Sequence, residues 1–159
     1  WCFVSAKCPH IGRGKRVPGS NVSWRTCSLA DDMLRHKVPE ELDHIRADKD
    51  LDLGLLVKFA YPVWQKGRWP ELQKYFLGND AEGLRKKDGR KGLQGIVDSG
   101  EPVLIDSNDT HPPFHIVMGS RIYKIDFKKG GRKNYVQGKM GEVNELQCTQ
   151  GCGSAPRAS

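Results

Sequence analysis

Hydrophobic and polar positions divide the chain into a helical first half and a β-rich second half. Across residues 28–78, apolar side chains recur at spacings of three and four, the period of a helix with one buried face. Residues 28–37 are expected to form a short helix, Pro39 begins a second at its first helical position, and Pro70 begins a third. Residues 51–59 either continue the second helix or form a buried helix of their own.

From residue 93 onward the apolar runs become short and are bounded by turn-forming residues, which is typical of strands. The clearest signal is a tight hairpin in which Gly119-Ser120 joins 114–118 to 121–127. The other expected strands are 95–97, 103–105, 135–136 and 143–147.

The two-residue loop sets the register of this hairpin, so His115 pairs with Lys124 and Phe114 pairs with Ile125. Residues two apart share a face of a strand. One face therefore carries the apolar side chains Phe114, Ile116, Met118, Tyr123 and Ile125. The opposite face carries His115, Lys124 and Asp126, with Val117 and Ile122 at the turn end.

Helices followed by antiparallel strands predict an α+β fold, and the length of 159 residues favours a single domain over 1–159. We expect an N-terminal irregular segment and two to three helices, then an antiparallel sheet, with the ends tied by disulfides. The expected segments are a disulfide-anchored loop at 1–27, a helical part at 28–78, a basic flexible loop at 79–92, the sheet at 93–148 and a flexible tail at 149–159.

The net charge and the composition indicate which classes of binding partner to expect. Lys and Arg number 26 and Asp and Glu 19, for a net charge of +7, which favours anionic partners or serves only to keep the protein soluble. No apolar run reaches the roughly 18 residues that span a bilayer. The start at Trp1 is typical of a mature terminus left by signal-peptide removal, although a trimmed chain would look the same.

Cysteines cluster at the two ends of the chain, with Cys2, Cys8 and Cys27 in the first thirty residues and Cys148 and Cys152 near the end. This placement favours disulfides and export. Pairing a head cysteine with a tail cysteine would close nearly the whole chain, but the connectivity stays open and one of the five is left over. Zinc is the competing explanation, although the spacings do not match the usual paired hooks. We expect no cofactor and no metal.

The polar face of the hairpin is the candidate active site. Lys124 beside His115 would lower the pKa of the imidazole and leave a neutral base near pH 7. A base next to a fixed cation suits cleavage of RNA, because the base takes the 2′-hydroxyl proton and the cation holds the phosphate. Glu101 and His111 are candidate acids, and Arg121 is a candidate phosphate contact. The alternative is an ordinary solvated sheet face.

Two further groups of residues admit both a functional and a structural interpretation. The basic loop is expected either to wrap a phosphate backbone or to be merely solvated; its cations are Arg85, Lys86, Lys87, Arg90 and Lys91. Tyr61, Trp64 and Trp69 are either a platform for sugars or bases or, as we favour, core beneath the helices.

Trp1-Cys2 at the start and Cys148 or Cys152 near the end resemble the small secreted effector proteins of plant-pathogenic fungi. One large group of these effectors has a ribonuclease-like fold, with a helix before an antiparallel sheet and a terminal cysteine that bridges back. The resemblance implies a secreted protein that acts by binding host RNA or proteins, often after losing catalytic residues.

These observations give one leading hypothesis and two alternatives. The first is a secreted, monomeric, cationic effector- or toxin-like protein that binds RNA, or cleaves it without metal, through His115, Lys124 and Asp126 and the basic loop. The second is a non-enzymatic secreted protein that binds a host protein or a polyanionic glycan. The third is a zinc-stabilised binding domain.

Overall fold

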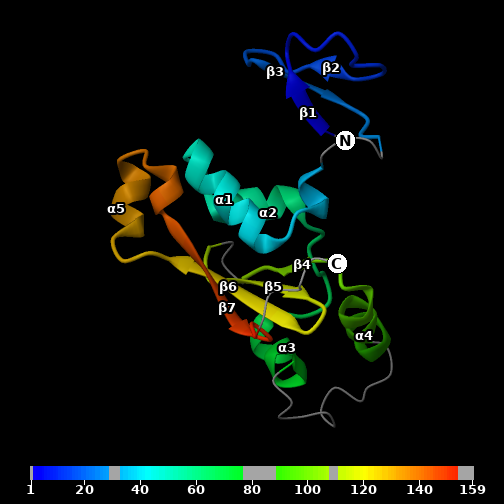
Figure 1. The fold of residues 1–159 in the computed structure, drawn as a ribbon, viewed down its shortest axis with the longest axis vertical. Coiled ribbons are helices and arrows are strands. Elements are labelled where there is room, and N and C mark those ends of the chain that lie inside the picture. Colours follow the sequence, from blue (N-terminus) through cyan, green and yellow to red (C-terminus); the bar gives the residue numbers. More distant parts are fainter. Residues whose placement is uncertain (1, 29–32, 77–88, 108–110, 154–159) are drawn as a thin grey trace. The chain divides into compact units, whose positions relative to one another are not determined.

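The computed structural model describes residues 2–28, 33–76, 89–107 and 111–153. Its chain divides into two compact units, Trp1–His36 and Lys37–Ser159. The single domain expected from the length stays a prediction, and the two units are described separately (Figure 1).

The N-terminal unit contains a small antiparallel sheet where an irregular loop was expected. Its strands are β1 (Cys2–Ser5), β2 (Lys15–Arg16) and β3 (Val22–Arg25), in the order β1-β3-β2. The Cys2–Cys27 disulfide links β1 to the residues just after β3. A side chain on Gly14 would place its Cβ 1.8 Å from the Trp24 carbonyl oxygen, so only glycine lets the chain approach β3 this closely.

The helix expected over 28–37 is much shorter. Within 28–37, the described residues form only the 3₁₀-helix η1 (Leu34–His36), and residues 29–32 lie outside the described part of the chain.

The C-terminal unit confirms the α+β class. Its helices are α1 (Pro39–Lys49), α2 (Leu53–Ala60), α3 (Trp69–Phe76), α4 (Gly89–Ser99) and α5 (Gly131–Val136), with the 3₁₀-helix η2 (Met140–Glu142). Its strands are β4 (Val103–Ile105), β5 (Phe114–Met118), β6 (Arg121–Phe127) and β7 (Asn144–Gln150). They form one antiparallel sheet in the order β4-β5-β6-β7.

The hairpin has the predicted register. Phe114 pairs with Ile125 and His115 with Lys124. Gly119 has a φ of 58°, in the left-handed region that favours glycine, which explains the tight two-residue turn.

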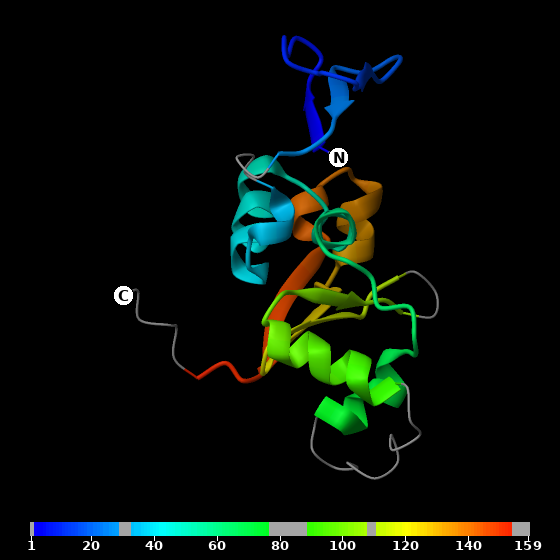
Figure 2. The same ribbon diagram turned by 90° about the vertical axis from the view of Figure 1, so that its right-hand side faces the viewer.

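Helices cover both faces of this sheet. Figures 1 and 2 show α1, α2 and α5 on one side and α3 and α4 on the other. On the first side Tyr123 donates a hydrogen bond of 2.7 Å to Glu40 of α1. On the second side a separate core forms, and its buried members are Leu72, Leu93, Ile96, Ile105 and Val117. The hairpin face expected to be polar and solvated is therefore partly covered by helices.

The helix α4 was not predicted. Residues 89–92 were assigned to the basic loop and 95–97 to a strand, yet all belong to one helix. Its buried residues Leu93 and Ile96 lie one helical turn apart and pack into the second core. Three glycines in this segment lower its helix propensity, so the helical spacing of its apolar residues was not apparent in the sequence. Residues 135–136 likewise belong to α5 and not to a strand.

The predicted helix start at Pro39 is confirmed. The α1 helix begins at Pro39, and the Glu41 carboxylate accepts a 2.8 Å hydrogen bond from the Val38 amide. Residues 53–60 form a separate helix, capped by Asp52, which accepts from the Leu55 amide at 3.0 Å. None of the described helices has the length and apolar character needed to cross a bilayer.

Candidate functional site

His115 is buried, only 6% exposed. The Trp69 ring of α3 lies parallel to the imidazole, with ring centroids 3.9 Å apart and planes inclined by 10°. The imidazole Nδ1 is buried and has no hydrogen-bond partner in the described part of the chain. The side chain expected to face substrate is thus sandwiched between the sheet and a helix.

The environment makes His115 a weak base. Burial, and then the nearby Lys124 ammonium, lower the pKa of the imidazole to about 4, while Asp126 opposes the shift. The predicted direction holds, but desolvation exceeds the charge of Lys124 as the cause. A general base must reach a substrate hydroxyl within hydrogen-bond distance, and only 6% of this residue is exposed.

Lys124 and Asp126 form an ion pair with each other, at 2.6 Å. Burial raises the pKa of the Asp126 carboxyl, but hydrogen bonds from Lys124 and the Phe127 amide, with the Lys124 charge, bring it below its ordinary value. Both side chains are about one third exposed. The positive charge of Lys124 is therefore already neutralised by the Asp126 carboxylate, which weakens its attraction for a phosphate.

The other candidate residues do not converge on His115. Arg121 lies on the opposite face of the sheet, 3.9 Å from Glu40. Glu101 follows Gly100, which lies beside the hairpin turn at Gly119. His111 precedes β5 at its other end, so the length of that strand, about 17 Å at ~3.4 Å per residue, separates it from Glu101.

The basic loop gives no site that can be described. Arg85, Lys86 and Lys87 lie outside the described residues. Arg90 and Lys91 belong to the first turn of α4, and their side chains are likewise not described.

Disulfides occur near both termini as expected, but each closes a local loop. Cys2 pairs with Cys27 and Cys148 with Cys152, so no head-to-tail bridge forms between them. Cys8 is the remaining free thiol. Since four of the five cysteines are bonded as disulfides, they supply no thiolates for zinc. Among the described residues no cluster of His, Cys, Asp and Glu is arranged to hold a metal.

The N-terminal sheet has an exposed aromatic and cationic face that the sequence analysis missed. Phe3 pairs with Trp24, and Trp24 pairs with Lys15 on its other side. Directly paired residues share a face, so the three side chains form one row across the strands. Phe3 is 59% exposed, Lys15 is exposed and Trp24 is partly buried. We call this row the aromatic–cationic row.

The burial pattern shows that this row lies on the outer face. Val4 and Ser23, on the opposite face, are less exposed than Phe3 and Val22. The alternation in 22–25 is the sequence signal that marks this strand. The glycines and prolines around it obscured the strand, because they suggested an irregular loop.

Positive charge is concentrated in the same unit. Residues 1–36 contain six Lys or Arg and two Asp, whereas residues 37–159 contain 20 Lys or Arg and 17 Asp or Glu. Arg13, Lys15 and Arg16 are exposed on or beside the edge strand β2. The field of this unit therefore attracts anions more strongly for its size than that of the rest of the chain.

Comparison of the chain with protein-family models, with curated proteins and with solved structures gave no match.

Proposed function

We propose that this protein binds single-stranded RNA on the N-terminal sheet, without cleaving it, as a secreted effector- or toxin-like protein. The observation that carries the proposal is the aromatic–cationic row of Phe3, Trp24 and Lys15 across one sheet face, in which Phe3 is 59% exposed.

Exposed aromatic rings on a sheet are suited to unpaired bases. Each base presents a flat π-face that stacks on such a ring, with a contribution of about 1–3 kcal/mol per base. Phe3 and Trp24 are neighbours across the strands, so a base that stacks on the exposed Phe3 ring lies next to the partly buried Trp24 ring. Double-stranded RNA keeps its bases stacked on one another and offers no such faces.

The cations beside the rings are placed to bind the phosphates of the same RNA strand. Lys15 extends the row, and Arg13 and Arg16 flank it in the sequence. Phosphates bound by such side chains release counterions, which makes binding weaken as salt rises. Stacking and charge together distinguish this face from a patch that is only basic.

Binding without cleavage agrees with the geometry around His115. The imidazole is stacked beneath Trp69 and buried, and Glu101 and His111 lie toward opposite ends of β5. This arrangement does not bring His115, Glu101 and His111 around one substrate atom. Secretion is supported by the two disulfides, because such bonds persist in oxidising compartments.

The decisive experiment is binding of a fluorescein-labelled single-stranded uridine oligomer to the full chain, followed by fluorescence anisotropy. Phe3→Ala is expected to weaken binding roughly 5- to 150-fold, the loss of one stacked base. Lys15→Gln is expected to weaken binding and to reduce the slope of log affinity against log salt by about 0.7, the loss of one phosphate contact.

Matched controls exist in the C-terminal unit. Phe59 is 76% exposed on α2 and Lys139 is exposed before η2, so Phe59→Ala and Lys139→Gln remove the same chemistry elsewhere. Equal losses for Phe3→Ala and Phe59→Ala, or equal affinity for duplex and single strand, would contradict the proposal. Binding of heparin, but not RNA, with sensitivity to Lys15→Gln would point to a polyanionic glycan as the partner.

The same oligomer tests for cleavage in the presence of EDTA. We expect it to stay intact. Cleavage by the wild type that disappears in His115→Ala would restore a metal-independent ribonuclease as the function. Cleavage that persists in the variant would place the chemistry elsewhere or in a contaminant.

A further inference from the structure

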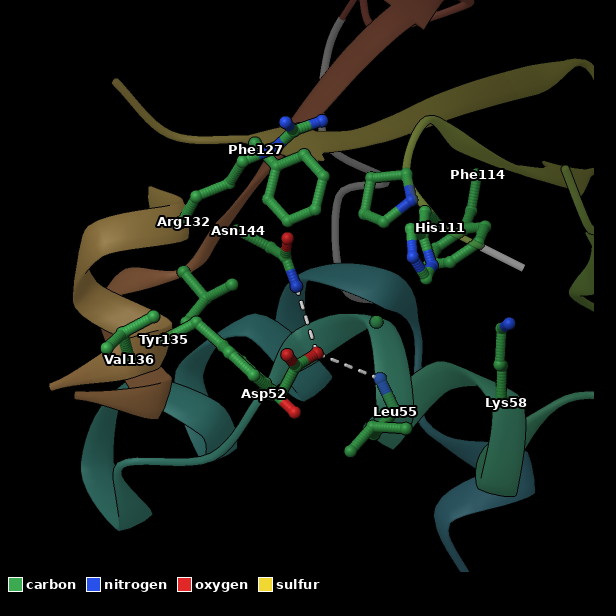
Figure 3. A pocket seen from close by; sticks show the side chains of 13 residues that line it. Asp52, Leu55, Lys58, His111, Phe114, Phe127, Arg132, Tyr135, Val136 and Asn144 are labelled. Atoms are coloured by element: carbon green, nitrogen blue, oxygen red, sulfur yellow. Dashed lines mark hydrogen bonds between the residues drawn. The ribbon is translucent and has the colours of Figure 1, made fainter. Parts of the chain in front are cut away.

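The C-terminal unit contains a cavity of about 650 Å³, a size typical of small-molecule sites. It lies among the start of α2, helix α5, the residues before β5 and the adjoining ends of β6 and β7 (Figure 3). Every residue that lines it belongs to this unit, and none belongs to the face proposed to bind RNA.

Most of the cavity wall is apolar. Phe114, Phe127 and Val143 come from the sheet side, and Leu55, Tyr135 and Val136 come from the two helices. The helical residues are largely exposed, with Leu55 at 56% and Val136 at 85%. Large apolar side chains exposed around a concavity mark a binding site, because covering them with a ligand removes apolar surface from water.

Gly54 allows the first turn of α2 to close one side of this cavity. A Cβ at this position would lie 2.9 Å from a ring carbon of Phe114 and 3.3 Å from the Asn144 amide nitrogen. The first contact is closer than a Cβ can come without a shift of the ring, and the second is tight. The backbone of α2 therefore approaches both residues at the cavity wall.

One polar group in the wall lacks a partner. Asn144 is 2% exposed, and its amide nitrogen donates to Asp52 Oδ1 at 2.9 Å. Turning the amide over would set two oxygens against each other, so the orientation is fixed. Figure 3 shows the amide oxygen turned away from Asp52, toward Phe127. This oxygen accepts no hydrogen bond from the described part of the chain.

A buried acceptor in this state favours any ligand that brings a donor to it. Because the oxygen exposes almost no surface, neighbouring side chains must shift for a hydroxyl to reach it, and the half-buried Phe127 ring lies on the side toward which the oxygen points (Figure 3). A ligand with a flat apolar body replaces the ring contacts that this shift removes.

The charges around the cavity favour an anion. Two cations, Lys58 and Arg132, line it, against one carboxylate, Asp52. The Asp52 carboxylate already accepts from the Leu55 amide and from Asn144. The Lys58 ammonium lies 4.3 Å from the centroid of Phe114, and the Arg132 guanidinium lies 5.4 Å from that of Phe127. Lys58 also pairs with Asp106 at 3.2 Å, so only part of its charge is available.

We infer that this cavity binds a small aromatic hydroxy acid. The aromatic body packs between Phe114, Phe127 and the apolar rim. The hydroxyl donates to the Asn144 oxygen, and the carboxylate lies in the positive field of the basic wall residues.

Three related probes separate these contributions, namely 6-hydroxy-2-naphthoate, 2-naphthoate without the hydroxyl, and 2-naphthol without the carboxylate. Their binding to the full chain is measured by calorimetry. The hydroxy acid is expected to bind with a dissociation constant below about 1 mM. Removing the hydroxyl should weaken binding about tenfold, the effect of one hydrogen bond. Removing the carboxylate should weaken binding and abolish its dependence on salt.

A pair of variants on α2 locates the site. Leu55→Gln changes the rim, whereas Phe59→Gln changes an exposed apolar residue one turn further on that does not line the cavity. Both positions are exposed, so neither change disturbs the core. Leu55→Gln is expected to weaken binding of 6-hydroxy-2-naphthoate severalfold, and Phe59→Gln to leave it unchanged.

The inference is overturned by any of three results. These are no binding of the hydroxy acid at 1 mM (about the weakest useful affinity), equal affinity for 2-naphthoate, or equal losses in the two variants. None of these results bears on RNA binding, because the two surfaces belong to different units.

Discussion

His115 shows how burial changes the chemistry of a single residue. Its imidazole fills the space between β5 and Trp69 and contributes a flat surface to the core on that side. Charging it there would leave a cation beside Lys124 and away from water, which is why its pKa falls to about 4. In this setting the imidazole is buried and packs against Trp69.

The lowered pKa makes stability depend on pH. The unfolded chain protonates His115 near pH 6.5, while the folded protein resists protonation until about pH 4. The unfolded state therefore binds more protons in this window, and stability falls as pH falls through it. Between pH 7.5 and pH 5 the free energy of unfolding should drop by about 2 kcal/mol.

Urea unfolding of wild type and His115→Phe at the two pH values measures this effect. The variant keeps the ring stack with Trp69 and has no titrating group, so it should lose much less stability. The carboxyl of Asp126, whose pKa is already below its ordinary value, stays charged throughout this range. A His115 that titrates above pH 6 by NMR would contradict the burial argument.

At the scale of elements, two glycines of α4 have opposite effects on the stability of the helix. Gly92 faces Trp64, where an added Cβ would lie 2.8 Å from the indole ring. An added Cβ at Gly95 would meet nothing within 4 Å. One glycine therefore permits close packing, and the other only weakens the helix.

Substituting each glycine by alanine separates these roles. Gly95→Ala should stabilise the protein by about 0.5–1 kcal/mol, because alanine loses less backbone entropy in a helix. Gly92→Ala should destabilise it by about 1–3 kcal/mol, because Trp64 must move. The shift in the urea midpoint measures both changes. Stabilisation by both variants would mean that Trp64 does not pack on α4.

At the scale of the molecule, the two disulfides serve different units. Cys2–Cys27 closes a loop with a sequence separation of 25, and Cys148–Cys152 one with a separation of 4. The chain-entropy model assigns them about 3.5 and 2 kcal/mol respectively. The N-terminal unit also has few residues with which to form a core, and units below about 40 residues usually need such crosslinks.

Removing each disulfide should therefore have different consequences. Replacing Cys2 and Cys27 by Ser should unfold the N-terminal sheet and abolish RNA binding, while the C-terminal unit stays folded. Replacing Cys148 and Cys152 should lower the stability of the C-terminal unit by about 2 kcal/mol or less and leave RNA binding intact. Amide hydrogen exchange follows each unit separately. Loss of exchange protection in both units of the first variant would contradict this independence.

Local signals in the sequence determined the elements that depend on neighbouring residues. Gly119-Ser120 fixed the hairpin and its register, and Pro39 fixed the start of α1. The α+β class followed from the order of the periods, and the clustered cysteines indicated disulfides near both ends. For the hairpin and the start of α1 the deciding energy comes from residues close in the chain, so a local pattern predicts them.

Tertiary structure alone decided what covers each strand. Alternation placed His115 and Lys124 on one face of the hairpin but could not show that Trp69, 46 residues earlier, would stack on the imidazole. The same limit hid the pairing of Phe3 with Trp24 and Lys15, and the cavity beside Asn144. These features join distant segments, and burial and charge there depend on packing that no local pattern contains.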